Sequence, residues 1–335
     1  MKIVVTHTFP DLDAITSVWL IHRFLAGWEE ASVEFVPAGE RKNPLEKEIL
    51  ASMTDPIEKV GDDEVIHVDT GLGPLDHHQT QDDSVCGASR TWEYIRVQSS
   101  PARNATQSVS GGEFRVQSKS ERVKLKEEAI SRMVKVVVAI DHFKEVFWPD
   151  ASADYQEFSL FGILEGLKLQ RPNEDTYYVD FIKQCLDATL HNFENRIWAE
   201  KEIKENGKEF KTKFGKGMAF ESLNDTVLKL AQKMGYMIVV RKDPRKGYVR
   251  IKARPFSGVS GKGKGESDID LTPVYEKLRQ MDPEATWFLH VSKKMLLNGT
   301  TKNPTMKATI LSLEQIVEVL EEKFKSQRSK VKISS

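Results

Sequence analysis

The chain of 335 residues is 39% apolar and 30% charged and carries a net charge of −1, a composition typical of a globular protein long enough for two domains. No stretch approaches the roughly 18 uninterrupted apolar residues that a membrane span requires, and nothing at the N-terminus is typical of an export signal. The two cysteines, Cys86 and Cys185, are too few for a disulfide framework or a zinc cluster. We therefore expect a cytoplasmic protein that does not contact membranes.

The N-terminal part of the chain alternates between strand-like and helix-like patterns. A β-branched run at residues 2–6 predicts a strand, and the apolar spacing over residues 14–25 predicts a helix that packs on a sheet. Further strands are predicted at residues 32–37 and 64–68, with a short helix at residues 44–53 between them. This alternation predicts a parallel sheet flanked by helices, in which ligands bind at the carboxyl ends of the strands.

Three further segments follow before the second domain. Residues 98–120 are rich in Ser, Gly, Asn, Gln and Arg and almost free of apolar residues, which predicts an exposed insertion. The run VKVVVAI at residues 134–140 predicts another buried strand, and Asp141 follows it directly. We assign residues 1–150 to the first domain and residues 151–206 to a helical linker.

A smaller second domain is predicted over residues 207–325, followed by a basic tail at 326–335. Its predicted strands lie at residues 237–241, 248–253 and 287–291, its predicted helices at 273–281 and 313–324, and a Gly/Lys loop at 258–265. We therefore expect an α/β protein with a parallel-sheet domain flanked by helices, a helical linker and a smaller α+β capping domain.

The first candidate motif is THTFPDLDAITS, which places His7, Asp11 and Asp13 on a strand-to-helix loop. These side chains converge if the chain turns sharply, and Pro10 favours such a turn. Carboxylates beside a helix N-terminus are also favoured without metal, so helix capping is the alternative role for both aspartates.

The second candidate motif is VIHVDTGLGPLDHHQT. An apolar strand leads to Asp69, and seven residues later come Asp76, His77 and His78. Carboxylate oxygens with a few imidazole nitrogens suit Mn²⁺ or Mg²⁺. The alternative is a pair of surface histidines that are adjacent by chance.

The third candidate is Asp141, which alone has the pattern of a helix cap or a turn residue. It becomes a candidate ligand because of the other aspartates: three Asp residues or clusters each follow an apolar strand in one predicted sheet. Carboxylates crowded at one edge repel one another and cost stability unless cations neutralise them. The sequence therefore predicts a metal site at this edge.

Together these residues resemble the four motifs of the DHH phosphoesterase superfamily, which includes family II inorganic pyrophosphatases, RecJ-type exonucleases and nanoRNases. The matching elements are HxxxDxD at residues 7–13, a strand-end Asp69, DHH at residues 76–78 and a later Asp141. The resemblance covers roughly residues 1–150, and CGASRTWEYI from Cys86 is similar to the turn and helix that follow DHH. The 98–120 insertion departs from the compact family domain.

The resemblance implies a site for two divalent cations, Mn²⁺ or Mg²⁺. It implies three pairs of metal ligands, namely His7 with Asp11 for one cation, Asp13 with His77 for the other, and Asp69 with Asp141 as bridges. Two cations so placed would activate a shared water as the hydroxide that attacks phosphorus. The implied catalytic role of His78 is to contact the scissile phosphate or the leaving group, and Asp76 would accept a hydrogen bond from an imidazole.

Candidate substrate-binding residues lie in the second domain. Arg250, Lys252 and Arg254 alternate along one predicted strand so that a single face carries all three. A second set, formed by His290, Ser292, Lys293 and Lys294, leaves another strand together. Such residues could hold a phosphate backbone, and the alternative is a solvated strand edge protected by charge.

The segment WFLHVSKKMLLNGTTKNP at residues 287–304 is similar to the C-terminal segment of the melanocyte-proliferating-gene family of DHH-related nucleases, where a strand ending in His-x-Ser leads to a Gly-containing loop. It lacks the Gly-Gly-Gly-His segment of many nanoRNase and RecJ-type relatives. Its Lys293-Lys294 pair resembles the Ser-Arg-Lys-Lys phosphate clamp of family II pyrophosphatases without the Arg.

The net charge is distributed unevenly along the chain. Residues 201–335 contain 28 Lys and Arg against 16 Asp and Glu, whereas residues 1–200 contain 21 against 34. A basic second part favours a polyanionic substrate. We therefore expect hydrolysis of phosphodiester bonds in short oligonucleotides or nucleic-acid ends. The alternatives are a pyrophosphate or small-nucleotide phosphohydrolase and a non-catalytic nucleic-acid or nucleotide binder.

Overall fold

The computed structural model describes the chain apart from residues 99–117, 256–268, 301–302 and 326–335. The predicted Gly/Lys loop, the predicted basic tail and almost all of the predicted insertion lie outside the described residues. The chain divides into two compact units, with the boundary between Glu194 and Asn195 inside helix α6 (Asp175–Asn206). Among the described helices, none is long and apolar enough to cross a membrane.

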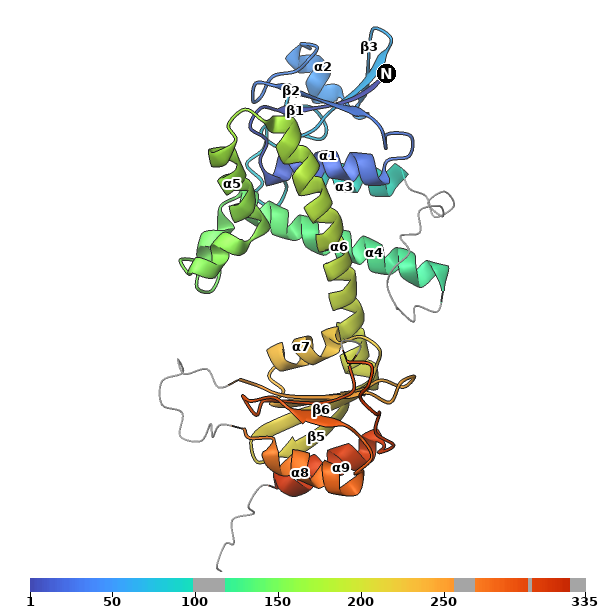
Figure 1. The fold of residues 1–335 in the computed structure, drawn as a ribbon. Helices are drawn as coiled ribbons and strands as arrows, with labels where there is room; N and C mark the ends of the chain where they lie inside the picture. The colour runs from blue at the N-terminus through green and yellow to red at the C-terminus, as the bar shows by residue number, and fades with distance from the viewer. Residues whose placement is uncertain (99–117, 256–268, 301–302, 326–335) are drawn as a thin grey trace, which may run out of the picture. The chain divides into compact units, whose positions relative to one another are not determined.

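The first unit is built on a four-stranded sheet in the order β2-β1-β4-β3 (Figure 1). Its strands are β1 (Lys2–His7), β2 (Ser32–Val36), β3 (Ile57–Val60) and β4 (Asp63–His67). β1 pairs in parallel with β2 and β4, but β3 pairs antiparallel with β4. The expected parallel sheet is therefore mixed, because a tight turn at Gly61, with φ +63°, reverses the chain between β3 and β4.

Two of the described helices of the first unit lie between strands of this sheet in the chain, and the others follow its last strand (Figure 1). They are α1 (Leu12–Phe24), α2 (Lys47–Ser52), α3 (Gly87–Gln98), α4 (Lys119–Asp141), α5 (Leu160–Gln170) and the first part of α6. Every residue of α1 from Leu12 to Ile21 is buried, and α1 packs against β1, α3 and α4. The segment expected as a linker, residues 151–206, thus contributes α5 and most of α6 to the first unit.

Helix α4 corrects the expected strand at residues 134–140. The helix begins after Ser118, whose side chain forms a capping box with Glu121, and it runs for 23 residues. Its buried apolar residues recur at helical spacing, at positions 129, 130, 133, 134 and 137, while Val136 is 39% exposed. Packing of this one face therefore outweighs the β propensity of the Val-rich run.

A half-buried histidine joins α1 to α6 within the first unit. Lys183 Nζ donates a hydrogen bond to Nδ1 of His22 at 2.9 Å, and Nε2 of His22 is buried without a hydrogen-bond partner. Burial, together with the charge of Lys183, lowers the pKa of His22 to about 4. Because this folded-state value lies below the ordinary value of 6.5, the stabilisation is present above pH 6.5 and is lost as the pH falls toward 4.

Replacing His22 with Gln is expected to reduce the acid sensitivity of the fold. Between pH 7 and pH 4.5, wild type should lose about 1–2 kcal/mol more unfolding free energy than the variant, after allowance for solvent screening. Urea unfolding of both proteins at the two pH values measures this difference, in which other titrating groups cancel. If the unfolding free energy of both proteins depended on pH in the same way, the pKa of His22 would not be lowered in the folded protein.

The second unit contains a six-stranded sheet in the order β5-β6-β7-β8-β10-β9. Its strands are β5 (Lys208–Thr212), β6 (Gly215–Glu221), β7 (Ile238–Lys242), β8 (Val249–Ala253), β9 (Trp287–Leu289) and β10 (Met295–Asn298). The pair β6–β7 is parallel and the other four pairs are antiparallel. The expected strands near 237–241, 248–253 and 287–291 correspond to β7, β8 and β9, whereas β5, β6 and β10 were not expected.

Helices pack on both sides of the second sheet and create two cores. Helices α8 (Thr272–Met281) and α9 (Leu313–Lys323), which match the expected helices, cover one face and bury Val249, Ile251 and Leu296. Helix α7 (Thr226–Lys233) and the end of α6 cover β6 and β7 on the other face. Each unit therefore has a mixed α/β structure.

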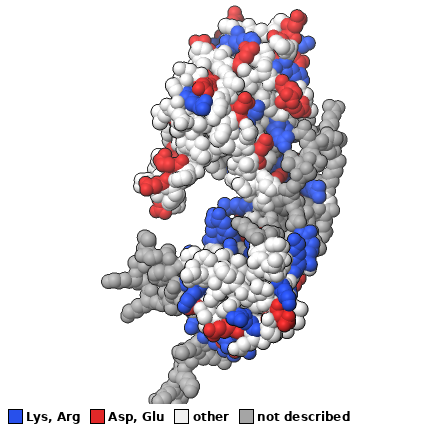
Figure 2. Space-filling model, in the orientation of Figure 1, with Lys and Arg blue, Asp and Glu red and all other residues white. Residues whose placement is uncertain are grey.

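Figure 2 shows where charged side chains lie in one view of the surface. Acidic and basic side chains are interspersed over the first unit in this view, and wide areas carry neither. The acidic excess of residues 1–200 is thus not gathered into one acidic face on this side, and part of it is buried in the site described next.

Candidate metal centre

The centre forms where two parallel strands end together. His7 is the last residue of β1, and Asp69 follows β4 by two residues. The pairing continues beyond β4, since Val68 N donates to Val5 O at 2.9 Å. It brings His7 Nε2 to 3.4 Å from Asp69 Oδ2. His7 Nδ1 lies 2.9 Å from the carbonyl oxygen of Thr8, so Nδ1 donates to that oxygen and Nε2 is the nitrogen that faces Asp69.

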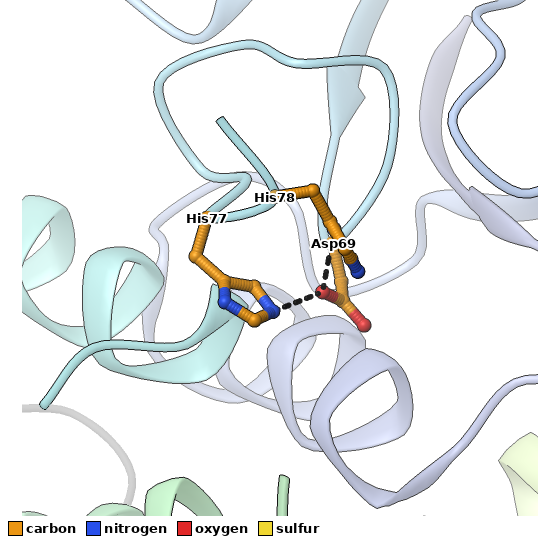
Figure 3. Close-up of side chains that lie close together, drawn as sticks. All are labelled: Asp69, His77 and His78. Atoms are coloured by element: carbon orange, nitrogen blue, oxygen red, sulfur yellow. Dashed lines mark ion pairs between the residues drawn. The ribbon is translucent and has the colours of Figure 1, made fainter. Parts of the chain in front are cut away.

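His77 is the centre of a ring of carboxylates. Its Nε2 lies 3.5 Å from Asp69 Oδ1, 3.5 Å from Asp141 Oδ2 and 3.8 Å from Asp13 Oδ2; Figure 3 shows the approach to Asp69. Each of these distances is too long for a hydrogen bond. Nε2 of His77, Oδ1 of Asp69 and Oδ2 of Asp141 are all buried without a hydrogen-bond partner. Burying three unsatisfied polar atoms around one point is costly, and a shared cation would satisfy all three.

Asp141 reaches this ring from a position that helix electrostatics disfavour. It is the last residue of α4, and not the end of a strand as expected. The C-terminal end of a helix carries partial negative charge, which repels a carboxylate. Its side chain is only 11% exposed. Capping does not account for a carboxylate at this place, whereas a cation bound there would offset the repulsion.

Asp13 is anchored by the start of α3. Its two carboxylate oxygens accept hydrogen bonds from the backbone N–H groups of Gly87 at 2.6 Å and Ala88 at 2.7 Å. A negative charge at a helix N-terminus is favourable. Gly87 permits this contact, since a Cβ there would lie 2.8 Å from Asp69 Cβ and 3.0 Å from Asp13 Oδ2.

The loop from Asp69 to His78 orients the two histidines. Asp69 has a left-handed backbone with φ 52°, a conformation that Asp tolerates better than bulky residues do. Asp76 is fully buried, and its Oδ2 accepts a hydrogen bond from Leu72 N at 2.6 Å. Its Oδ1 lies 2.7 Å from Nδ1 of His78, which is the imidazole contact expected of Asp76. Because Nδ1 of His78 is occupied, Nε2 is the nitrogen left to contact a ligand, and the side chain is 55% exposed.

The pKa values reflect crowded, buried charge. Burial raises the pKa of Asp69 to about 6, although the hydrogen bond with His7 lowers it. Burial and the charges of Asp69 and Asp11 raise the pKa of Asp13 well above its usual range. Burial lowers the pKa of His7, but its hydrogen bonds outweigh this effect and raise the pKa to about 9. Without a cation, Asp69 and Asp13 therefore hold protons more tightly than usual.

Three overlapping groups of side chains could each hold a metal ion, with ligand atoms within 4.8 Å of one another. The groups are His7 with Asp11 and Asp69, Asp69 with His77 and His78, and His77 with Asp141 and His142. The structure thus brings together the expected ligands, with Asp13 beside the groups. These groups offer four imidazole nitrogens and three carboxylate oxygens, a donor set of the kind that binds divalent cations in proteins.

His142 is a candidate ligand that sequence reasoning missed. Its Nε2 lies 2.8 Å from the carbonyl oxygen of Val85 and 3.5 Å from Asp141 Oδ2. Its ring packs edge-on against His77, with ring centroids 5.7 Å apart. The Asp-His dipeptide at positions 141 and 142 is the signal in the sequence from which His142 could be predicted.

The expected substrate-binding residues lie in the second unit. Arg250 and Lys252 share a face of β8, but Arg254 lies beyond the end of the strand. His290 Nδ1 lies 2.8 Å from Ser292 Oγ, and Lys293 Nζ donates to Asp270 at 2.9 Å. Lys294 Nζ donates to the carbonyl oxygen of Ile269. The second set therefore lies in the turn between β9 and β10, where both lysines already have protein partners.

Comparisons with known proteins add little to this geometry. No family model matches the chain, and no curated protein matches it. Among solved structures, it is similar to an uncharacterized protein from Helicobacter pylori G27, with 14% identity over 97% of this chain and 99% of that chain and a TM-score of 0.22.

Proposed function

We propose that this chain is a metal-dependent phosphoesterase of the DHH superfamily that hydrolyses phosphodiester bonds of short oligonucleotides or nucleic-acid ends. The observation that carries the proposal is the buried ring in which Nε2 of His77 faces Asp69 and Asp141 with three polar atoms left unsatisfied. Two divalent cations, Mn²⁺ or Mg²⁺, would supply an activated water and would offset charge on the phosphoryl oxygens.

The chain's own residues divide the remaining tasks. His7, Asp11, Asp69, His77 and Asp141 would hold the cations, with Asp13 and His142 beside them. Asp76 fixes the ring of His78 through Nδ1, so that Nε2 of His78 can donate a hydrogen bond to the phosphate or a proton to the leaving oxygen. Asp13 positions α3 against the site through Gly87 and Ala88.

Two alternatives use the same site. A pyrophosphate or small-nucleotide hydrolase would need the same ligands but little of the basic second part of the chain. A non-catalytic nucleotide or nucleic-acid binder would have no use for His78, whose side chain is exposed beside buried ligands. The basic excess of residues 201–335 favours the longer polyanion.

Metal removal tests the proposal across a substrate panel. Pyrophosphate, a cyclic dinucleotide, an RNA pentamer and a DNA pentamer are incubated with the full chain in Mn²⁺, and again after chelation and Mn²⁺ restoration. We expect turnover of a pentamer that chelation abolishes and Mn²⁺ restores. Turnover of pyrophosphate alone would favour the small-phosphate alternative, and binding without any turnover would favour the non-catalytic binder.

A further inference from the structure

One side of the second sheet carries an exposed aromatic ring in β9 next to basic side chains. Strand pairing aligns Arg250, Leu297 and Phe288 in one row. In the next row, Lys252 pairs with Met295, and His290 N donates to Met295 O at 2.9 Å. We call the surface formed by these two rows the β8–β10–β9 face.

The face is the side of these strands that points away from α8 and α9. Strand side chains alternate, and Val249, Ile251 and Leu296 enter the core with those two helices. On the opposite side, α7 packs against β7, while Phe288 of β9 stays 49% exposed. The rings of Phe288 and His290 meet edge-on with centroids 6.5 Å apart. The sheet therefore presents a supported aromatic platform to solvent.

Positive charge exceeds negative charge beside this platform. Arg250 and Arg241 both form ion pairs with the carboxylate of Asp225, and the negative charge of Asp243 also acts on Arg241. Within the described part of the chain, the ammonium group of Lys252 has no hydrogen-bond or ion-pair partner. The positive charges of Arg250 and Lys229 also lie close to Lys252. An anion on this face would relieve the repulsion among these cations.

We propose that the β8–β10–β9 face binds single-stranded nucleic acid, with a base stacked on Phe288 and phosphates held by Lys252 and Arg250. Proteins that bind single strands without sequence preference hold the phosphates by positive charge and stack the bases on aromatic rings, because every base has a face that can stack. The bases of a duplex are already stacked and cannot reach the ring. This inference rests on the proposed function and narrows its substrate to single strands.

Binding in the absence of metal separates this inference from the catalytic proposal. Binding of labelled single-stranded RNA and DNA hexamers to the full chain is measured by fluorescence anisotropy in EDTA. Removal of the metal lets binding be measured without hydrolysis. Replacing Phe288 with Ala should weaken binding roughly 5- to 150-fold, and Phe288→Trp should restore it. Lys252→Met should make the salt dependence shallower, reducing the magnitude of the slope of log affinity against log salt concentration by about one. Ile310→Ala is the matched control, because Ile310 is an apolar residue of the same unit whose side chain is 87% exposed.

The outcomes separate the occupants of the face. The inference would be overturned if wild type showed no detectable affinity for the hexamers, or if wild type and Phe288→Ala bound them equally well. It would also be overturned if a duplex competed as well as the single strand. A dimer that Phe288→Ala converts to a monomer, with hexamer binding unchanged, would assign the face to a second copy of the chain. Hexamer binding that depends on Phe288 but comes without turnover in Mn²⁺ would support this inference and refute only the catalytic proposal.

Discussion

Replacing Asp69 with Asn is expected to abolish hydrolysis while making the metal-free protein more stable. Asp69 lies within reach of both His7 and His77, so losing its charge should lower the turnover rate by about 10³-fold or more. Its folded-state pKa of about 6 lies above its ordinary value of 3.8, so the ionised side chain destabilises the fold above pH 6. At pH 8 in EDTA, the variant should therefore gain about 1–2 kcal/mol of unfolding free energy.

Mn²⁺ should reverse this order of stability. Wild type should gain about 2.7 kcal/mol at a metal concentration 100 times the dissociation constant, whereas the variant should gain much less. Asp150→Asn is the matched control, because Asp150 is exposed and has φ 54°, close to the 52° of Asp69. Thermal unfolding with and without Mn²⁺ measures both effects. Equal stabilisation of all three proteins by Mn²⁺ would refute a metal site at Asp69.

Adding one methyl group at Gly87 is expected to disrupt the centre without removing any ligand. In Gly87→Ala, the new Cβ would lie 2.8 Å from Asp69 Cβ and 3.0 Å from Asp13 Oδ2, so α3 or the carboxylates must move. Overpacking of this kind costs about 1–3 kcal/mol of unfolding free energy. A displacement of catalytic groups by about 1 Å lowers activity by about 100-fold. Urea unfolding and steady-state turnover measure the two losses.

Gly166→Ala is the control for this experiment. Gly166 lies inside α5, and a Cβ there would meet nothing within 4 Å. Replacing a helical Gly with Ala at an open position should stabilise the fold by about 0.5–1 kcal/mol and leave turnover unchanged. If Gly87→Ala behaved like Gly166→Ala, the close packing of α3 on Asp13 and Asp69 would have no role in the site.

Local sequence pattern was sufficient to find most of the site. The run ending at His7 and the run before Asp69 are short segments rich in β-branched residues, which predict buried strands without knowledge of their neighbours. Polar residues directly after such strands fall at one edge of a sheet. For this reason the sequence alone predicts most of the candidate metal ligands.

The same local reasoning failed where packing, and not propensity, decides the structure. Val134 and Val137 belong to an apolar run typical of a strand, yet they lie on the buried face of a helix that begins at Ser118. The helical period becomes visible only when the run is extended back to Ala129 and Ile130. The decisive contact is with α1 and α3, which are distant in sequence.

By itself, the sequence determined which side chains could hold a metal ion and which strands end beside them, because those properties depend on residue type and on periodicity over a few residues. Only the tertiary structure decided that Asp141 ends a helix, that His142 joins the site, that α3 anchors Asp13, and that Phe288 shares a face with Lys252. Each of these facts depends on contacts between residues far apart in the chain. Such contacts are set by the packing of helices and the register of strands, which no local pattern specifies.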